Sequence, residues 1–344
     1  MITYTLKVVD IRKETQDTIT LSFKQPGLKK IKYKAGQYLS LFFRINGRRY
    51  IRPYSFSSSP STDSKIEVTV KRVANGIVSN HVHDRVQVGD LIEAMEPMGD
   101  FTYESKENIK SIFFWGAGSG ITPLFSIIKE VLNSEPLVPL TLIYGNRNFE
   151  STIFANEIEL LLNVYPDRFK IWHFQTKLSV INSDPYIIEG RINRDFVIRV
   201  LKDVNIIQSM HYICGPTGLK DSVCEGLNSL GVPSENIFFE EFEMVKDPEE
   251  LQDISTQTVK IIFQKIEYNL EIVKGQSILE SALDTGLELP YSCQTGNCSS
   301  CMASCVRGSV KMIGPGKKRI DLLANECLLC CSYPKSGDVC LEIN

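Results

Sequence analysis

Cysteine is concentrated near the carboxyl end of this chain. Seven of its ten cysteines lie between Cys293 and Cys331, and three of them follow a C-x4-C-x2-C pattern at Cys293, Cys298 and Cys301. The stretch from Met1 to Asp17 lacks the apolar core of a secretion signal, so we expect reduced thiols rather than disulfides. Crowding of reduced thiols indicates that this part of the chain folds around a metal or cluster site.

The spacing fits two kinds of site. Two ferric ions that share two sulfides need two more sulfur ligands each, and a C-x4-C-x2-C loop with a distant fourth cysteine supplies them. A single zinc ion also fits, because the pairs Cys298–Cys301 and Cys327–Cys330 are both C-x2-C. Zinc would leave Cys293 without a role, which favours the binuclear cluster.

Length and charge narrow the classes of function. At 344 residues the chain is too long for one ordinary core and suggests two or three domains. Its 43% hydrophobic and 23% charged residues are typical of a folded globular protein. A formal net charge of −3 gives no global basic field, so we expect no nucleic-acid partner. The sharpest basic run, Lys317, Lys318 and Arg319, is our candidate for a docking surface for a partner protein.

The hydrophobic pattern changes twice along the chain. In about the first hundred residues apolar and polar residues alternate, as in Thr18 to Phe23, which predicts an antiparallel barrel or sandwich. From about Ile109 apolar strand candidates alternate with helical stretches, which predicts a parallel α/β sheet. An acidic stretch containing Pro248 then precedes a short unit. We therefore predict domains at 1–104, 105–243 and 258–344, with a linker at 244–257.

The uncharged stretch from Ser111 to Ile128 approaches the length of a membrane span. It contains three glycines between Gly116 and Gly120, followed by Pro123, and these would break a lipid-exposed helix. A strand, a glycine loop and a helix start explain the stretch better. We therefore expect no membrane span and a cytoplasmic protein.

A second motif, in the predicted barrel, suits a flavin dinucleotide. In the run Arg52 to Ser55, the arginine can bind pyrophosphate oxygens with both arms of its guanidinium. Tyr54 would lie on the same strand face, where its ring could stack on an isoalloxazine. The run Gly76 to Ser79 follows Val70 to Arg72 and begins a candidate helix, whose first amides could receive phosphate. Either run alone could be ordinary strand or turn sequence, and the combination favours a flavin site.

A glycine-rich turn from Gly116 to Pro123 follows a predicted strand and precedes a predicted helix. Glycines there let the backbone approach a pyrophosphate, although Ile121 stands where the Rossmann pattern has its third glycine. A later strand ends at Cys214 to Pro216. Arg147, after another strand, could meet a 2′-phosphate, and no acid stands at a convincing ribose position. A glycine-rich turn of this kind alone could be purely structural. If it holds a pyridine nucleotide, as the resemblance given below implies, Arg147 favours NADPH over NADH.

Together the motifs resemble the ferredoxin–NADP reductase superfamily joined to a plant-type [2Fe-2S] ferredoxin domain. Leu287 to Cys301 and Leu328 to Pro334 carry the ferredoxin part of this resemblance. The order of the three motif sets is similar to reductase components of multicomponent oxygenases, such as that of phenylacetyl-CoA epoxidase. The resemblance implies a multidomain fold with an antiparallel β-barrel flavin domain, an α/β parallel-sheet nucleotide domain and an α+β, β-grasp-like ferredoxin domain.

The resemblance also implies which residues hold the cofactors. In this family Arg52 and Ser79 would hold the pyrophosphate of FAD, and Tyr54 would stack on the flavin. Ser55 would contact the reactive N5 edge and Cys214 would lie near the nicotinamide, so these two would flank the hydride path as catalytic residues. The full set implied for FAD and NADPH or NADH is Arg52, Pro53, Tyr54, Ser55, Val70, Lys71, Arg72, Gly76, Ile77, Val78, Ser79, Gly116, Gly118, Ser119, Gly120, Thr122, Pro123, Arg147, Cys214, Gly215, Pro216 and Phe242.

The fourth ligand of the cluster also comes from the resemblance. Spacing alone does not separate Cys330 from its neighbour Cys331. In the family the last ligand lies four residues before a proline, here Pro334, which selects Cys330. The ligand set implied is Cys293, Cys298, Cys301 and Cys330.

The implied activity follows from electron counting. NAD(P)H delivers two electrons as a hydride, a [2Fe-2S] cluster takes one, and a flavin between them can accept two and release them singly. We therefore expect an oxidoreductase that passes electrons from NAD(P)H through FAD and the cluster to a terminal oxygenase, hydroxylase or other one-electron acceptor protein. Two alternatives are a redox-sensing electron-transfer subunit and a free flavin or quinone reductase with an idle cluster.

Overall fold

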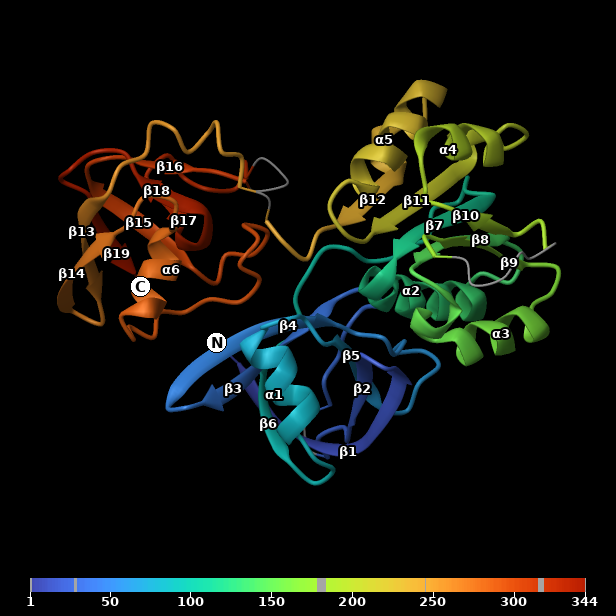
Figure 1. Cartoon of the computed structure of the whole chain (residues 1–344), viewed down its shortest axis with the longest axis horizontal. Coiled ribbons are helices and arrows are strands. Elements are labelled where there is room, and N and C mark those ends of the chain that lie inside the picture. The colour runs from blue at the N-terminus through green and yellow to red at the C-terminus, as the bar shows by residue number, and fades with distance from the viewer. Residues whose placement is uncertain (1, 28–29, 178–183, 245, 315–318, 344) are drawn as a thin grey trace. The chain divides into compact units, whose positions relative to one another are not determined.

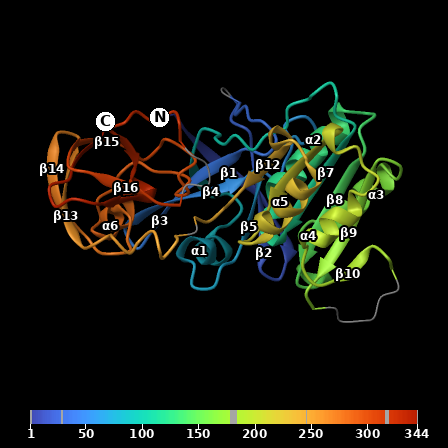
Figure 2. The ribbon, with the colours of Figure 1, turned by 90° about the horizontal axis from the view of Figure 1, so that it is seen from above.

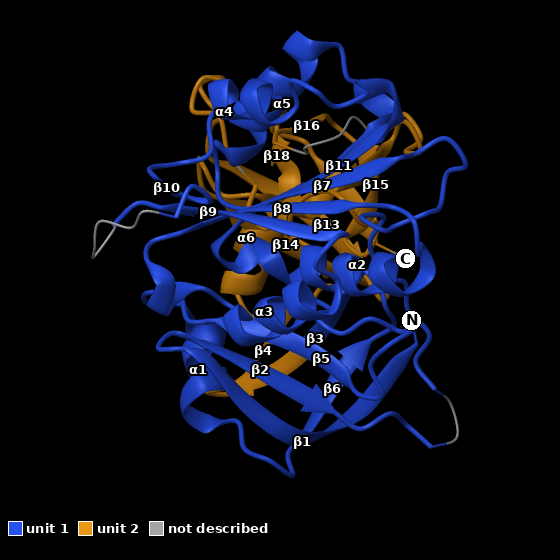
Figure 3. Cartoon of the chain, turned by 90° about the vertical axis from the view of Figure 1, so that its right-hand side faces the viewer, with its two compact units in different colours: residues 1–41, 54–240 blue, residues 42–53, 241–344 orange. Residues whose placement is uncertain are grey.

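The computed structural model describes residues 2–27, 30–177, 184–244, 246–314 and 319–343. The chain forms two compact units, one of Met1–Leu41 with Tyr54–Glu240 and one of Phe42–Pro53 with Glu241–Asn344 (Figure 3). Among the described residues, no helix is long and apolar enough to cross a membrane.

The amino-terminal part is a curled antiparallel sheet of six strands in the order β4-β3-β6-β1-β2-β5 (Figure 1). Its alternating sequence explains the fold, because every second side chain of a strand faces the core: Ile66, Val68 and Val70 are all fully buried. A helix, α1 (Ile77–Arg85), follows the strand that carries these three residues. The strands are β1 (Thr3–Thr15), β2 (Thr18–Phe23), β3 (Tyr38–Ile45), β4 (Arg48–Ser55), β5 (Ile66–Lys71) and β6 (Leu91–Met95).

The middle part is a parallel sheet in the order β10-β9-β8-β7-β11-β12. Helices α2 (Ile121–Ser134) and α3 (Ala155–Val164) cover one face, and α4 (Arg194–Val200) and α5 (Leu219–Leu230) cover the other (Figure 2). The strands are β7 (Ser111–Ala117), β8 (Leu140–Asn146), β9 (Phe169–Gln175), β10 (Ile187–Glu189), β11 (Ser209–Cys214) and β12 (Ile237–Glu240), with 3-10 turns at Gly118–Gly120, Phe149–Ser151, Ile206–Gln208 and Ser234–Asn236.

The carboxyl-terminal part combines a five-stranded sheet, in the order β14-β13-β19-β15-β17, with the pair β16-β18. Its helix α6 (Ile278–Asp284) begins with a capping box, in which Ser277 and Glu280 bond each other's backbone amides. The strands are β13 (Gln257–Phe263), β14 (Ile266–Ile272), β15 (Met302–Arg307), β16 (Val310–Met312), β17 (Glu326–Leu328), β18 (Ser332–Pro334) and β19 (Cys340–Ile343), with the 3-10 turn η5 at Leu329–Cys331. The three predicted folds are confirmed, and the predicted domain boundaries stay a prediction.

A buried polar network crosses the middle of the parallel sheet. Trp115 Nε1 donates to His211 Nδ1 at 3.3 Å, and His211 Nε2 lies 2.9 Å from Ser209 Oγ. The Ser209 hydroxyl donates to the Ile206 carbonyl, so the Nε2 proton of a neutral imidazole completes the network. No acceptor is left for a second ring proton, and burial lowers the pKa of His211 to about 3.

We therefore expect the free energy of unfolding of the first unit to fall in mild acid, at a pH above the range in which most carboxylates titrate. Because the unfolded histidine binds a proton near pH 6.5 and the folded one does not, the free energy of unfolding should fall by about 1.4 kcal/mol per pH unit below pH 6.5. Burial also lowers the pKa of His173 and His83, which adds to the same trend. Urea unfolding between pH 7.5 and 5 measures the slope, and His211→Asn should reduce it. An unchanged slope in the variant would contradict the role assigned to His211.

Candidate functional site

The four predicted cluster ligands lie close together in two pairs within the second unit. Cys298 Sγ lies 3.0 Å from Cys293 Sγ, and the thiols of Cys301 and Cys330 hydrogen-bond each other. Two pairs of thiols are the arrangement that two iron ions need, each taking two protein sulfurs.

The two sulfurs of the first pair differ in acidity. The hydrogen bond from Cys298, assisted by the Thr295 amide 3.4 Å from the sulfur, lowers the pKa of Cys293. The same hydrogen bond, with burial, raises the pKa of Cys298, because the two sulfurs share one proton. Ligation requires the thiolate form, and binding iron would release the remaining protons.

The neighbouring thiols make different contacts. Cys331 Sγ, which also lies against Cys330, donates to the Leu328 carbonyl at 3.5 Å. Cys327 hydrogen-bonds Ser332 rather than Cys330, so the two C-x2-C pairs do not converge as a zinc ribbon would need. The donor set therefore fits a [2Fe-2S] cluster.

The predicted flavin residues lie on β4 and around α1. Arg52 and Tyr54 alternate along β4, so their side chains leave the same face of the strand. Ser79 Oγ accepts from the Val73 amide and donates to the Gly76 carbonyl, which shapes the turn before the helix. No side chain caps α1, so its first amides remain available and fit a phosphate of a dinucleotide.

Two cations of the predicted flavin site, Arg72 and Lys71, lie beside carboxylates in the structure. Arg72 donates to Asp84 Oδ1 at 2.6 Å and to Asn80 Oδ1 at 2.8 Å. Its guanidinium therefore binds two side chains of α1. The Lys71 ammonium lies 3.7 Å from Asp17 and 3.9 Å from the position that a Cβ on Gly118 would take. Lys71 therefore brings a positive charge to the glycine-rich loop rather than to α1.

The glycine-rich loop packs against the turn that follows β11. A Cβ on Gly120 would lie 2.1 Å from the Cys214 carbonyl oxygen, so only glycine fits there. Thr122 is 2% exposed and donates to the Ser119 carbonyl, and Tyr144 donates to the Gly118 carbonyl from beneath. Thr122 and the buried Pro123 thus shape the loop from inside. No side chain caps α2, so its amino end can receive phosphate.

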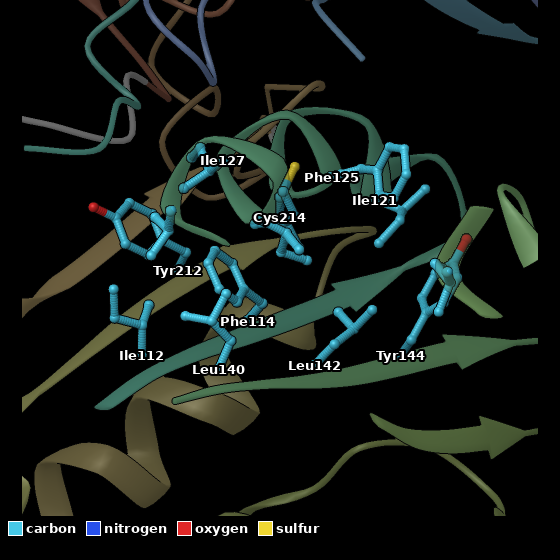
Figure 4. Close-up of a cluster of buried hydrophobic side chains, with 14 of the residues drawn as sticks. Ile112, Phe114, Ile121, Phe125, Ile127, Leu140, Leu142, Tyr144, Tyr212 and Cys214 are labelled. Atoms are coloured by element: carbon cyan, nitrogen blue, oxygen red, sulfur yellow. The ribbon is translucent and has the colours of Figure 1, made fainter. Parts of the chain in front are cut away.

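The residues expected along the hydride path meet a third residue that the sequence analysis missed. Cys214 and Glu240 are paired at the carboxyl ends of the neighbouring strands β11 and β12. Ser55 Oγ donates to Glu240 Oε2 at 3.3 Å. Figure 4 shows Cys214 among the core side chains, and it is 1% exposed. Ser55 therefore bonds the residue that stands opposite Cys214 in the strand register of the first unit.

Arg147 lies at the same carboxyl edge of the parallel sheet. Arg147 follows β8 and is exposed, and its carbonyl accepts from the Lys177 amide at 2.8 Å. A cavity of about 400 Å³, which sequence reasoning did not predict, opens beside β10 and α4. Phe174 and Phe196 line it together with Arg191 and Arg199. Phe242 lies in the second unit and is 41% exposed.

Comparison with protein families gives three successive matches. Residues 5–103 match the oxidoreductase FAD-binding domain, residues 114–225 the oxidoreductase NAD-binding domain, and residues 261–335 the 2Fe-2S iron-sulfur cluster binding domain. FAD, NAD(P)H and a [2Fe-2S] cluster are therefore confirmed as the cofactors.

Individual proteins are similar over nearly the whole chain. The ferredoxin reductase component of 3-ketosteroid-9-alpha-monooxygenase from Rhodococcus rhodochrous is 31% identical, with 89% of this chain and 87% of the relative covered. One of the subunits of 1,2-phenylacetyl-CoA epoxidase from Escherichia coli K12 is 29% identical, with 99% and 98% covered. Among solved structures, phthalate dioxygenase reductase matches with a TM-score of 0.69 and 26% identity, covering 99% of this chain and 98% of that chain. The chain thus belongs to the family of ferredoxin-tailed oxygenase reductases, oxidoreductases that join FAD-binding, NAD-binding and 2Fe-2S-binding domains in one polypeptide.

Proposed function

We propose that this chain takes hydride from NADPH and passes the electrons one at a time to a terminal oxygenase in the cytoplasm. The observation that carries the proposal is the pairing of the thiols Cys293–Cys298 and Cys301–Cys330 in a chain that also holds the Ser55–Glu240–Cys214 arrangement. Bound FAD would supply the chemistry that no side chain has, which is to accept two electrons together and release them singly.

The side chains around Ser55 orient the reacting groups. Cys214 and Glu240 end adjacent strands, so the parallel sheet fixes the distance between them. Because Ser55 Oγ donates to Glu240 Oε2, the carboxylate orients the Ser55 hydroxyl at the end of β4. Orientation and exclusion of water are what hydride transfer chiefly requires.

The identity of the acceptor is inferred from the relatives. Their names describe a reductase component of a monooxygenase and a subunit of an epoxidase. By analogy, the acceptor of this chain is an oxygenase protein rather than a nucleic acid or a free quinone. A dedicated oxygenase also favours turnover over a purely redox-sensing role.

The nucleotide preference rests on the cations at the carboxyl edge of the sheet. Arg147 follows the second strand of the nucleotide domain, where a 2′-phosphate would need a cation. The cavity beside β10 and α4 could receive the adenosine end, because Phe174 and Phe196 offer apolar walls and Arg191 a charge. We therefore expect Arg147 and the cavity residues to bind NADPH more tightly than NADH.

Anaerobic reduction of the holoprotein tests the proposal. With stoichiometric NADPH, the visible absorbance of the flavin should bleach, and the low-temperature EPR signal of a reduced [2Fe-2S] cluster should appear. NADH should give the same end point more slowly. Bleaching without the EPR signal would contradict the electron path, and faster reduction by NADH would contradict the nucleotide preference while leaving the path intact.

A further inference from the structure

Arg319 reaches the loop that carries three of the cluster ligands. It lies in the segment between β16 and β17, yet its Nη1 donates to the Gly296 carbonyl at 3.0 Å and to the Cys298 carbonyl at 3.2 Å. Its Nη2 donates to Ser299 Oγ at 2.8 Å. One guanidinium thus binds three successive points along the cluster loop, on either side of the ligand Cys298.

The guanidinium has no N–H group left over. Besides the three bonds to the loop, its Nε and Nη2 donate to the two carboxylate oxygens of Asp321 at 2.7 and 2.6 Å. These five bonds use all five N–H donors of an arginine. The Arg319 side chain is only 12% exposed, so it is not a free cation for a docking partner. Lys317 and Lys318, the other members of the predicted docking run, lie outside the described residues.

The bonds to the two carbonyls fix two peptide planes of the loop. In a trans peptide the N–H group points opposite to the C=O group. Because the Gly296 and Cys298 carbonyls point at Arg319, the amides of Asn297 and Ser299 must point away from it. The amides of Thr295, Cys298 and Ser300 in the same loop bond the Cys293 and Cys298 sulfurs, and hydrogen bonds to the sulfurs are one of the terms that set the potential of such a cluster.

The positive charge of Arg319, like amide hydrogen bonds to the sulfurs, raises the reduction potential of the cluster. A [2Fe-2S] cluster becomes more negative by one charge when it is reduced, so a nearby cation favours the reduced state. Asp321 balances Arg319 formally, but it is 59% exposed, and water screens its charge more than that of the buried guanidinium. The pair therefore leaves a net positive field on the loop side.

We propose that Arg319 is a positioning residue for the [2Fe-2S] cluster: it holds the Gly296–Ser299 backbone in its ligand-presenting conformation and raises the reduction potential of the cluster. The inference rests on the cluster site of the proposed function and adds a residue outside the ligand set. Lysine should replace only part of this role, because an ammonium keeps the charge but lacks the planar fork that binds two carbonyls together.

The test compares Arg319→Gln and Arg319→Lys in the holoprotein. A redox titration followed by EPR should show that Arg319→Gln disfavours the reduced cluster by about tenfold, equivalent to about 59 mV for one electron. Arg319→Lys should change the same equilibrium by less than about threefold. Its reduction potential should therefore shift by less than half as much as that of Arg319→Gln. Both variants should lose iron to a chelator several-fold faster than wild type, and their g values should shift because the amides are no longer fixed.

Two further variants keep the test decisive. Lys260→Gln removes a cation of the same unit, bonded to Glu267 at 2.8 Å on the β13–β14 hairpin, and should leave the potential and iron loss unchanged. Ser299→Ala removes one of the five acceptors and should shift iron loss in the same direction by less, even if Arg319→Gln takes up no cluster. Wild-type potential, g values and iron retention in both Arg319 variants would overturn the inference. A wild-type protein without a cluster signal would instead overturn the proposed function.

Discussion

The variant Cys330→Ser should lack the [2Fe-2S] cluster and should fail to reduce an acceptor protein, while its flavin is still bleached by NADPH. Cys330 supplies one of the two sulfurs of the second pair and is 4% exposed. Its loss leaves Cys301 alone at one iron, and a binuclear cluster needs two thiolates for each iron. Iron and sulfide content, EPR and the rate of flavin bleaching measure the three expectations.

Cys331→Ser is the matched control for this variant. Cys331 is adjacent in sequence and fully buried, but its thiol donates to the Leu328 carbonyl, a bond that a serine hydroxyl can also make. The cluster content of Cys331→Ser should therefore stay near that of wild type. A cluster that survives in Cys330→Ser and disappears in Cys331→Ser would show that the fourth ligand has been misassigned.

Gly120→Ala should slow reduction of the flavin by NADPH by about 100-fold, because a displacement of about 1 Å at a hydride-transfer site has effects of this size. The new Cβ would lie 2.1 Å from the Cys214 carbonyl oxygen and 2.7 Å from the Gly215 Cα. Backbone on both sides of this contact must move apart, which should also lower the free energy of unfolding by about 1–3 kcal/mol. Stopped-flow absorbance measures the rate.

Gly145→Ala separates a local clash from a general effect of adding a methyl group. Gly145 lies in strand β8. A Cβ at this position would lie 3.5 Å from the Ala117 Cβ, which is an ordinary van der Waals contact. Reduction of the flavin in this variant should remain within about threefold of wild type, a change of less than 1 kcal/mol in the barrier. Equal rates in Gly120→Ala and wild type would mean that the contact between the two loops does not position the nucleotide. Direct reduction of the cluster by dithionite should be unaffected in both variants.

Local sequence patterns were sufficient to predict the folds and the cluster, whereas the roles of single side chains stay predictions. The C-x4-C-x2-C spacing places its cysteines within one loop, so short-range geometry is enough to bring Cys293 and Cys298 together. In the sequence, nothing distinguishes Arg72 from Arg147 as a candidate phosphate-binding cation. Only the folded chain shows that Arg72 is bound to Asp84, whereas Arg147 is exposed at the edge of the sheet.

Long-range pairs account for the residues that were missed. Glu240 stands in an acidic run that suggests only solvent exposure, and its partner Ser55 is 185 positions away. The useful signal was its place at the end of β12, next to Cys214 at the end of β11. Arg319 was grouped with two lysines as a surface cation, because sequence cannot show that five acceptors from two segments converge on it.

The two thiol pairs differ in what must fold before each can form. Cys293 and Cys298 belong to one loop, so their pair can assemble while the rest of the unit is still unstructured. Cys301 meets Cys330 only after β15 and β17 have paired in the register that sets Met302 opposite Leu328. The first pair therefore depends on local geometry, whereas the second depends on the folded sheet. Ligation of the second iron is thus coupled to the pairing of β15 with β17, so cluster binding stabilises that part of the sheet.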